Sequence, residues 1–205
     1  MGYSNFKKLN QVSQRFGLTA FYKNLFSDVT PVQPSAWLLE TIEIAYIAPP
    51  TNEKGKSERL VSPTLLEVYR HYGENLAFFS GEEINISSED DLAGPCDFFF
   101  CLHPPSLYIQ RPIISLTEAK DEDLEWGVAQ CAAQLYAAFR FNEQQNKGLP
   151  VLYGCASDGV EWQFLKLENN TFYVDKKPMT DLAQILGTWH WIFQYYLDFQ
   201  KEENK

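Results

Sequence analysis

Hydrophobic residues follow two patterns along this chain, and these patterns predict its helices and strands. At helical spacing they predict a short amphipathic helix over residues 5–16, a second helix over 36–47 and a third over 57–72. Two longer helices are expected, one from about residue 123 in an alanine-rich stretch and one after Thr180, which can cap an aromatic-rich segment. Short runs of β-branched, aliphatic and aromatic residues predict strands over residues 76–86, 94–103, 114–120, 149–156, 160–168 and 171–174.

The order of these elements predicts the fold class. From residue 57 onward the order is helix, three strands, helix and strand (αβββαβ), which describes an α/β protein with a mixed sheet flanked by helices. We expect a single globular unit, in which residues 57–205 form the core and residues 1–56 form an N-terminal helical embellishment packed on it. The polar stretch 51–56 between the two is expected to be flexible.

Charge, cysteine content and hydropathy limit the class of protein. The formal net charge of −10 argues against broad electrostatic attachment to nucleic acid, so any such contact has to be local. The four cysteines are scattered in apolar runs, which indicates core thiols in a reducing cytoplasm. No stretch approaches the roughly 20 apolar residues of a membrane span, and the chain start lacks the apolar core of a signal peptide. We therefore expect a soluble, cytoplasmic protein without membrane contact.

Three ionisable residues are predicted to meet at the ends of two adjacent strands. Glu118 and Lys120 are two residues apart in one strand, so their side chains leave the same face of the sheet. If this strand and the preceding one form a hairpin that is symmetric about residues 107 and 108, Asp97 lies directly opposite Glu118. This register requires that no bulge intervenes, because a slip of one residue would turn Asp97 to the other face.

The residue types at this position suit metal-assisted hydrolysis of a phosphodiester. Carboxylates such as Asp97 and Glu118 bind hard divalent cations, either Mg²⁺ or Mn²⁺, which keep several water ligands. An adjacent lysine, here Lys120, can orient the attacking water and offset the charge that develops on phosphorus. For Glu118 and Lys120 alone, the alternative is an exposed ion pair at the end of a strand.

Two further residues are candidates for the same site. In helix 57–72 the apolar residues cluster around the direction of Glu58, which predicts Glu58 on the buried face as a third metal ligand and Glu67 in solvent, provided that Pro63 does not kink the helix strongly. The alternative for Glu58 is a helix-start carboxylate favoured by the helix dipole. Gln130 lies on the helix that overhangs the site, where it either contacts the substrate during catalysis or bonds to a strand carbonyl.

Four runs of the sequence resemble the PD-(D/E)XK nuclease superfamily, which has the restriction-endonuclease-like fold; they are SERLVSP, GPCDFFF, ISLTEAK and GVAQCAAQLYAA. The resemblance covers about residues 57–168 and is strongest to a bacterial group of this superfamily. It implies that Asp97 matches the metal-binding aspartate, that Glu118 and Lys120 match the E-x-K motif, that Glu58 matches the first-helix acid and that Gln130 matches the glutamine of the following helix. In this chain Pro95 stands two residues before Asp97 rather than immediately before it.

The expected function is therefore a metal-dependent nuclease that acts on nucleic acid, with DNA as the expected substrate, in repair, restriction or defence. The alternative is a non-catalytic interaction protein that keeps the nuclease-like fold, which the net charge favours, whereas the intact acidic and lysine positions favour the nuclease. The C-terminal helix is a candidate homodimer contact, because it carries a broad apolar stripe that one sheet face would not fully cover. The stripe consists of Ile185, Leu186, Trp189, Ile192, Phe193 and Tyr196.

Overall fold

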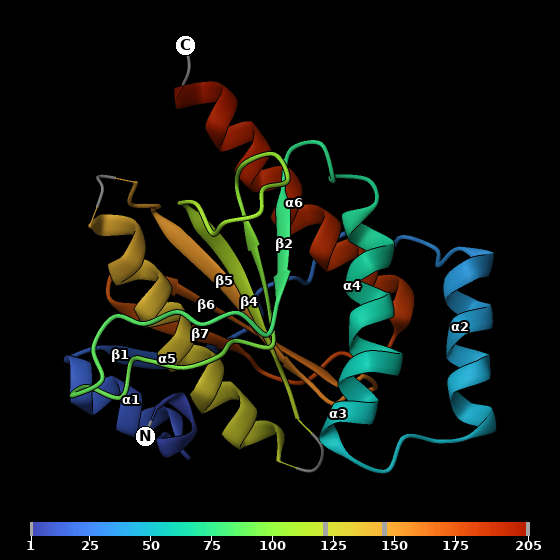
Figure 1. Ribbon diagram of the computed structural model, residues 1–205, viewed down its shortest axis with the longest axis horizontal. Helices are drawn as coiled ribbons and strands as arrows, with labels where there is room; N and C mark the ends of the chain where they lie inside the picture. Colours follow the sequence, from blue (N-terminus) through green and yellow to red (C-terminus); the bar gives the residue numbers. More distant parts are fainter. Residues whose placement is uncertain (1, 121–122, 145–146, 204–205) are drawn as a thin grey trace.

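A seven-stranded mixed sheet forms the centre of the computed structural model, which describes residues 2–120, 123–144 and 147–203 (Figure 1). The sheet order is β1-β7-β6-β5-β4-β3-β2, and within it the pairs β1–β7 and β4–β5 are parallel. The predicted α/β class with a mixed, helix-flanked sheet is confirmed. The strands are β1 (Thr19–Lys23), β2 (Ala77–Ser80), β3 (Phe98–Cys101), β4 (Ile113–Ala119), β5 (Val151–Ser157), β6 (Trp162–Glu168) and β7 (Thr171–Asp175).

The N-terminal segment contributes to this sheet, which the hydrophobic pattern did not predict. Residues 1–56 were expected to be a helical embellishment, and they do contain α1 (Leu9–Phe16) and α2 (Ala36–Ile47). They also contain β1, which pairs in parallel with β7 from Thr19 opposite Thr171 to Lys23 opposite Asp175. The N-terminal segment is therefore an integral edge of the sheet.

The helices lie at the predicted positions, with differences at their ends. Ser35 caps α2 as expected, because its hydroxyl accepts a hydrogen bond from the Leu38 N–H at 3.2 Å. Asp181, not Thr180, caps the last helix by accepting from the Gln184 N–H at 2.8 Å. The helices are the short η1 (Tyr3–Asn5), α1 (Leu9–Phe16), α2 (Ala36–Ile47), α3 (Glu53–Lys56), the π-helical η2 (Ser57–Val61), α4 (Ser62–Tyr69), α5 (Leu124–Glu143) and α6 (Leu182–Glu203). Although α5 and α6 are long, neither they nor any other described helix is apolar enough over a sufficient length to cross a membrane.

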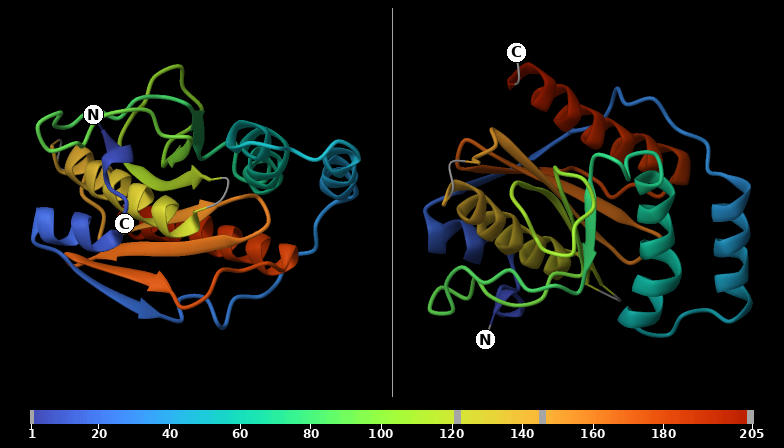
Figure 2. Two further views of the ribbon diagram at one scale, coloured as in Figure 1. Left: turned by 90° about the horizontal axis from the view of Figure 1, so that it is seen from below. Right: turned by 45° about the horizontal axis from the view of Figure 1, so that its top comes forward.

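The two long helices cover opposite faces of the sheet (Figure 2). Small residues let α5 lie close to β5: a Cβ atom added at Gly154 would lie only 2.7 Å from the Cys131 sulfur. On the other face, Tyr196 of α6 donates hydrogen bonds to the carbonyl oxygens of Ile114 and Val151, both at 2.9 Å. All four cysteines are buried free thiols, as expected.

The apolar stripe of α6 is completely covered within the chain. Each of its six residues, from Ile185 to Tyr196, is at most 1% exposed. The expectation that one sheet face would leave part of this stripe uncovered is wrong, because aromatic residues from β3 and β6, Phe100 and Phe164, also pack against Trp189. Because the stripe is buried within the chain, it gives no support to a homodimer through α6. Self-association itself stays a prediction.

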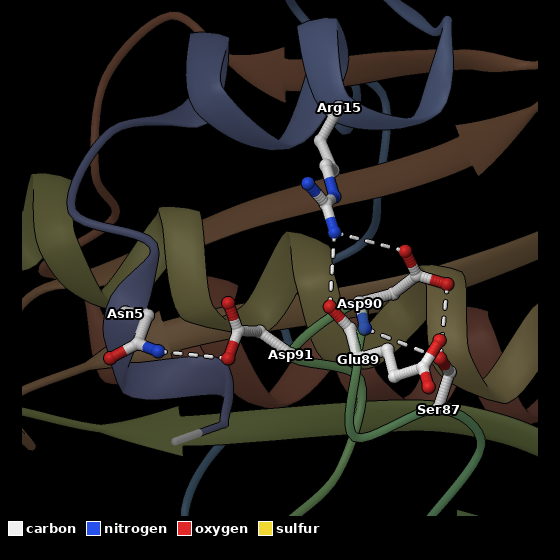
Figure 3. Close-up of polar contacts among 6 residues, drawn as sticks. All are labelled: Asn5, Arg15, Ser87, Glu89, Asp90 and Asp91. Carbon is white, nitrogen blue, oxygen red and sulfur yellow. Dashed lines mark hydrogen bonds and ion pairs between the residues drawn. The ribbon is translucent and has the colours of Figure 1, made fainter.

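The N-terminal segment also holds the long connection between β2 and β3, residues 81–97, which we call the acidic loop (Figure 1). Arg15 of α1 donates to the Glu89 carbonyl at 3.0 Å and pairs with Asp90 at 3.1 Å. Asn5 donates to the Asp91 carboxylate at 2.8 Å (Figure 3). These contacts fasten the acidic loop, and with it Asp97, to the N-terminal helices.

The two glutamates of the helix expected over residues 57–72 have the opposite exposure to that predicted. Glu67 is buried at 4% exposure and accepts hydrogen bonds from the Ser35 N–H and hydroxyl, both at 3.0 Å. Glu58 is exposed and pairs with Lys54 at 3.8 Å. The prediction that Glu58 is buried and Glu67 solvated is wrong because α4 is covered on two sides: Leu65 packs in the core, and Glu67 on the other side contacts Ser35 at the start of α2. Glu58 lies in the π-helical η2, where the rotation of 100° per residue does not hold.

Replacement of Glu67 by alanine should lower the free energy of unfolding by about 1–3 kcal/mol, since the N–H and hydroxyl of Ser35 lose their acceptor. Glu58→Ala is the matched control on the same helical segment and should change stability by less than about 0.5 kcal/mol, because its side chain is exposed. Urea unfolding followed by circular dichroism measures both. Equal losses in the two variants would contradict this assignment of the buried face.

Candidate active site

The pairing of β3 with β4 sets two carboxylates side by side. Phe98 lies opposite Thr117 in this antiparallel pair, so the next pair in the register is Asp97 and Glu118, as the hairpin symmetry predicts. The irregularity in this pairing lies toward the other end of β3 and leaves the register at the site unchanged. Asp97 is anchored here because its Oδ2 atom accepts a hydrogen bond from the Ala119 N–H at 2.8 Å.

Four of the five predicted site residues line one pocket of about 400 Å³ at the C-terminal end of β4. Its walls come from residues 2–4, from the acidic loop, from Glu53 of α3 and from the first turns of α5. In Figure 1 this end of β4 lies between α3 and the N-terminal helices. The four predicted residues around the pocket are Asp97, Glu118, Lys120 and Gln130.

Glu118 and Lys120 form a buried ion pair with further partners. The Lys120 Nζ atom lies 3.0 Å from Glu118 Oε1 and 3.3 Å from an oxygen of Glu53. The other oxygen of Glu118 accepts a hydrogen bond from Gln134 Nε2 at 2.6 Å. Because Glu118 and Lys120 are only 4% and 7% exposed, the alternative of an exposed ion pair at a strand end is excluded.

Burial is the main reason that the pKa values of both carboxyl groups are raised, and negative neighbours add to the rise. Burial raises the pKa of Glu118 to about 7 and nearby Asp97 adds to this rise, although Lys120 and Gln134 act in the opposite direction. Burial also raises the pKa of Asp97, against the lowering effect of the Ala119 N–H and Lys120. For Lys120, burial acts to lower the pKa, but the carboxylates of Glu118 and Glu53 outweigh it and the pKa is raised. One lysine thus does not fully compensate the negative charge gathered here.

Glu58, the fifth predicted residue, does not reach this pocket. It lines a separate hollow between α2 and η2 together with Arg59 and Pro63. Glu53 occupies the position expected for an acid from the first helix, since its carboxylate contacts Lys120. The stretch around Glu53 was expected to be flexible, yet Asn52 caps α3 by accepting the Gly55 N–H at 2.8 Å. An asparagine followed directly by an acidic residue is the sequence signal that identifies this short helix.

The first turns of α5 provide two glutamines to the site. The Gln130 side-chain oxygen is buried and has no hydrogen-bond partner within the described chain. No hydrogen bond from its side-chain N–H to a strand carbonyl is found among the described residues either. A buried acceptor left unpaired costs about 1–3 kcal/mol, and this one faces the pocket, where a ligand can supply the donor. Gln134, one turn later, was not among the predicted site residues, although helical spacing places it on the same stripe of α5 as Gln130; its side-chain N–H donates to Glu118 at 2.6 Å.

The residues of this pocket fit a cation that keeps most of its water ligands. Among the described residues, no group of three or more His, Cys, Asp and Glu side chains is arranged to hold a metal ion, so the expected set of Asp97, Glu118 and Glu58 is not formed. What the pocket offers is two adjacent carboxylates with raised pKa values and the unpaired oxygen of Gln130. Mg²⁺ is commonly bound through one or two carboxylates with several waters retained.

Neither a protein-family model nor a curated protein sequence matches this chain, so the assignment of a function rests on the site itself.

Mn²⁺ should raise the melting temperature, because a ligand of the folded state stabilises it by RT ln(1 + [L]/Kd), about 2.7 kcal/mol at 100 times Kd. The stabilisation should weaken as the pH falls through about 7, since protonated Glu118 must lose its proton before it binds a cation. Thermal denaturation at about pH 6 and about pH 8, with and without Mn²⁺, measures this. Asp97→Asn should lose the shift and Glu58→Gln should keep it; a pH-independent shift, or one that survives in Asp97→Asn, contradicts the site.

Proposed function

We propose that this protein is a metal-dependent nuclease that hydrolyses phosphodiester bonds, with DNA as its substrate. The observation that carries the proposal is a pair of carboxylates, the partly buried Asp97 and the buried Glu118, with Lys120 in direct contact with Glu118 at one pocket. Ionisable groups with perturbed pKa values that converge in a cleft are typical of functional sites. Buried ion pairs often add little to stability, because well-packed apolar residues can replace them without loss of stability. A role in stability alone would therefore not account for the buried charges at this pocket.

The arrangement of the core supports an assignment to the PD-(D/E)XK superfamily and its restriction-endonuclease-like fold. Antiparallel β2, β3 and β4 are followed by α5 and by β5, which is parallel to β4. This is the αβββαβ order that the resemblance implies. In the proposed assignment Glu53 takes the role of the first-helix acid in place of Glu58, and Pro95 remains the departure from the motif.

The chain's own residues have distinct proposed roles. Asp97 and Glu118 would hold Mg²⁺ or Mn²⁺, which when bound acts as a Lewis acid toward a phosphoryl oxygen and lowers the pKa of coordinated water. Lys120 donates hydrogen bonds to the phosphate and to the attacking water, which offsets the negative charge of the transition state. The side chain of Glu53 is half exposed, so an incoming phosphate can take its place beside Lys120. Gln130 accepts a hydrogen bond from a water or a substrate donor.

The second candidate function is a non-catalytic interaction protein that retains this fold. Two observations favour it: the formal net charge is −10, and both oxygens of Glu118 already have protein partners. Catalysis then requires that a cation and substrate rearrange the contacts of Lys120 and Gln134. Activity measurements on variants distinguish the two functions.

Lys120→Met should reduce DNA cleavage by at least about 100-fold, the usual scale for loss of a group that moves a proton or stabilises charge in catalysis. It should leave Mn²⁺-dependent stabilisation largely intact, because the lysine acts on water and phosphate. Lys166→Met removes another partly buried, ion-paired lysine, 2.8 Å from Glu168, and should keep full activity. Fragment release on denaturing gels provides the measurement. Undiminished cleavage by Lys120→Met, in a folded protein, would contradict the proposed mechanism.

A further inference from the structure

The proposed catalytic residues lie at the floor of a recess that is small and built from remote segments. Glu118 and Lys120 are almost fully buried, and the pocket that reaches them has a volume of about 400 Å³. Pockets of this size bury molecules of small-ligand dimensions. A single nucleotide unit matches that scale. The convex surface of an intact duplex, in contrast, is too wide to reach Glu118 and Lys120 at the bottom of the pocket.

The walls of the recess are held in place by direct contacts. Tyr3, one of the wall residues, donates its hydroxyl to the Ile84 carbonyl of the acidic loop at 2.5 Å. Asn5 and Arg15 fasten the same loop through Asp91 and Asp90 (Figure 3). The N-terminal wall and the acidic loop therefore form one connected rim over the site.

The charge of the acidic loop opposes a duplex more strongly than a single strand. The acidic loop contains no lysine or arginine, and its six acidic residues are Glu82, Glu83, Glu89, Asp90, Asp91 and Asp97. A duplex carries one phosphate charge per roughly 1.7 Å of its axis, twice the density of one strand at roughly 3.4 Å. Repulsion at the rim is correspondingly larger for the duplex.

Trp126 provides the wall with a surface suited to an unpaired base. It lines the pocket, and its indole N–H is buried without a hydrogen-bond partner in the described chain. Lys120 Nζ lies 5.2 Å from the ring centroid, and Lys7 Nζ lies over the ring at 3.2 Å, so a base that stacks on this face takes the place of the Lys7 ammonium group. Aromatic side chains beside positive charges are the usual platform on which bases of single strands stack. A base held at Trp126 keeps its phosphate on the Lys120 side of the pocket.

We infer that the site takes an unpaired nucleic-acid strand, with one nucleotide seated in the pocket against Trp126, and excludes intact duplex. This inference rests on the proposed nuclease function. It adds the strandedness of the substrate and assigns Trp126 a binding role. Lys120 and Lys7 supply positive charge beside Trp126. Two lysines at one pocket suit the phosphate of a single nucleotide and not an extended phosphate backbone.

Cleavage of four DNA substrates with Mn²⁺ tests the strandedness: a linear single strand, a circular single strand, a linear blunt duplex and a relaxed, covalently closed duplex. We expect cleavage of the single strands and at least about 100-fold slower cleavage of the closed duplex. Equal or faster cleavage of the closed duplex would overturn the inference while it upheld the nuclease. Cleavage of none of the four would overturn the nuclease function itself, and this inference with it.

Substitution at Trp126 tests the base platform independently of turnover. The affinity for a fluorescent single-stranded oligonucleotide, measured by anisotropy in EDTA, should fall by about 5-fold to about 150-fold in Trp126→Leu, the equivalent of about 1–3 kcal/mol per stacked base. Leucine keeps an apolar side chain in the wall, and Trp126→Phe should restore most of the affinity because it restores a ring. Trp37→Leu, on α2 and 46% exposed outside this pocket, should bind as the native protein does. Unchanged affinity in a folded Trp126→Leu variant would refute the platform.

Discussion

Two adjacent carboxylates, the partly buried Asp97 just before β3 and the buried Glu118 of β4, are the constraint around which the site is organised. Charged groups removed from water are costly unless they are paired and hydrogen-bonded. Asp97 obtains a backbone N–H from Ala119, and Glu118 obtains Lys120 and Gln134. Their pKa values nevertheless remain raised, mainly because burial disfavours the charged forms and also because other negative groups lie nearby. In the proposed function a divalent cation would offset this negative charge.

The surrounding elements matter because they bring the compensating groups to this one position. The close contact of α5 with β5 at Gly154 lets the helix overhang the sheet with its glutamines toward Glu118. The short helix α3 supplies Glu53, and the N-terminal helices hold the acidic loop that ends at Asp97. The pocket is consequently a tertiary feature in which every wall comes from a different part of the chain, and its small size follows from these contacts.

The parts that could be predicted from sequence depend on short-range geometry. The convergence of Asp97 with Glu118 follows from hairpin symmetry and the two-residue period of strands. The exposure of Glu58 and Glu67 could not be predicted. Glu67 is covered by the start of α2 at Ser35, which is a tertiary contact, and Glu58 lies in a π-helical turn that changes the angle between residues. β1 was missed since its pairing depends on β7, about 150 residues away, and all five of its residues are exposed. Likewise, an apolar stripe on α6 is visible in the sequence, whereas the aromatic residues that cover it are contributed by distant strands.

The claim that Asp97 and Glu118 form one cation site is tested most directly by anomalous diffraction from crystals grown with Mn²⁺. The predicted result is a single strong anomalous peak within about 2.0–2.6 Å of an oxygen of each carboxylate, with the Gln130 side-chain oxygen directed toward the cation or its waters. In the same crystals, Glu58 should show no peak. A peak bound only by other acidic residues, or no peak between Asp97 and Glu118 at millimolar Mn²⁺, would contradict the assignment.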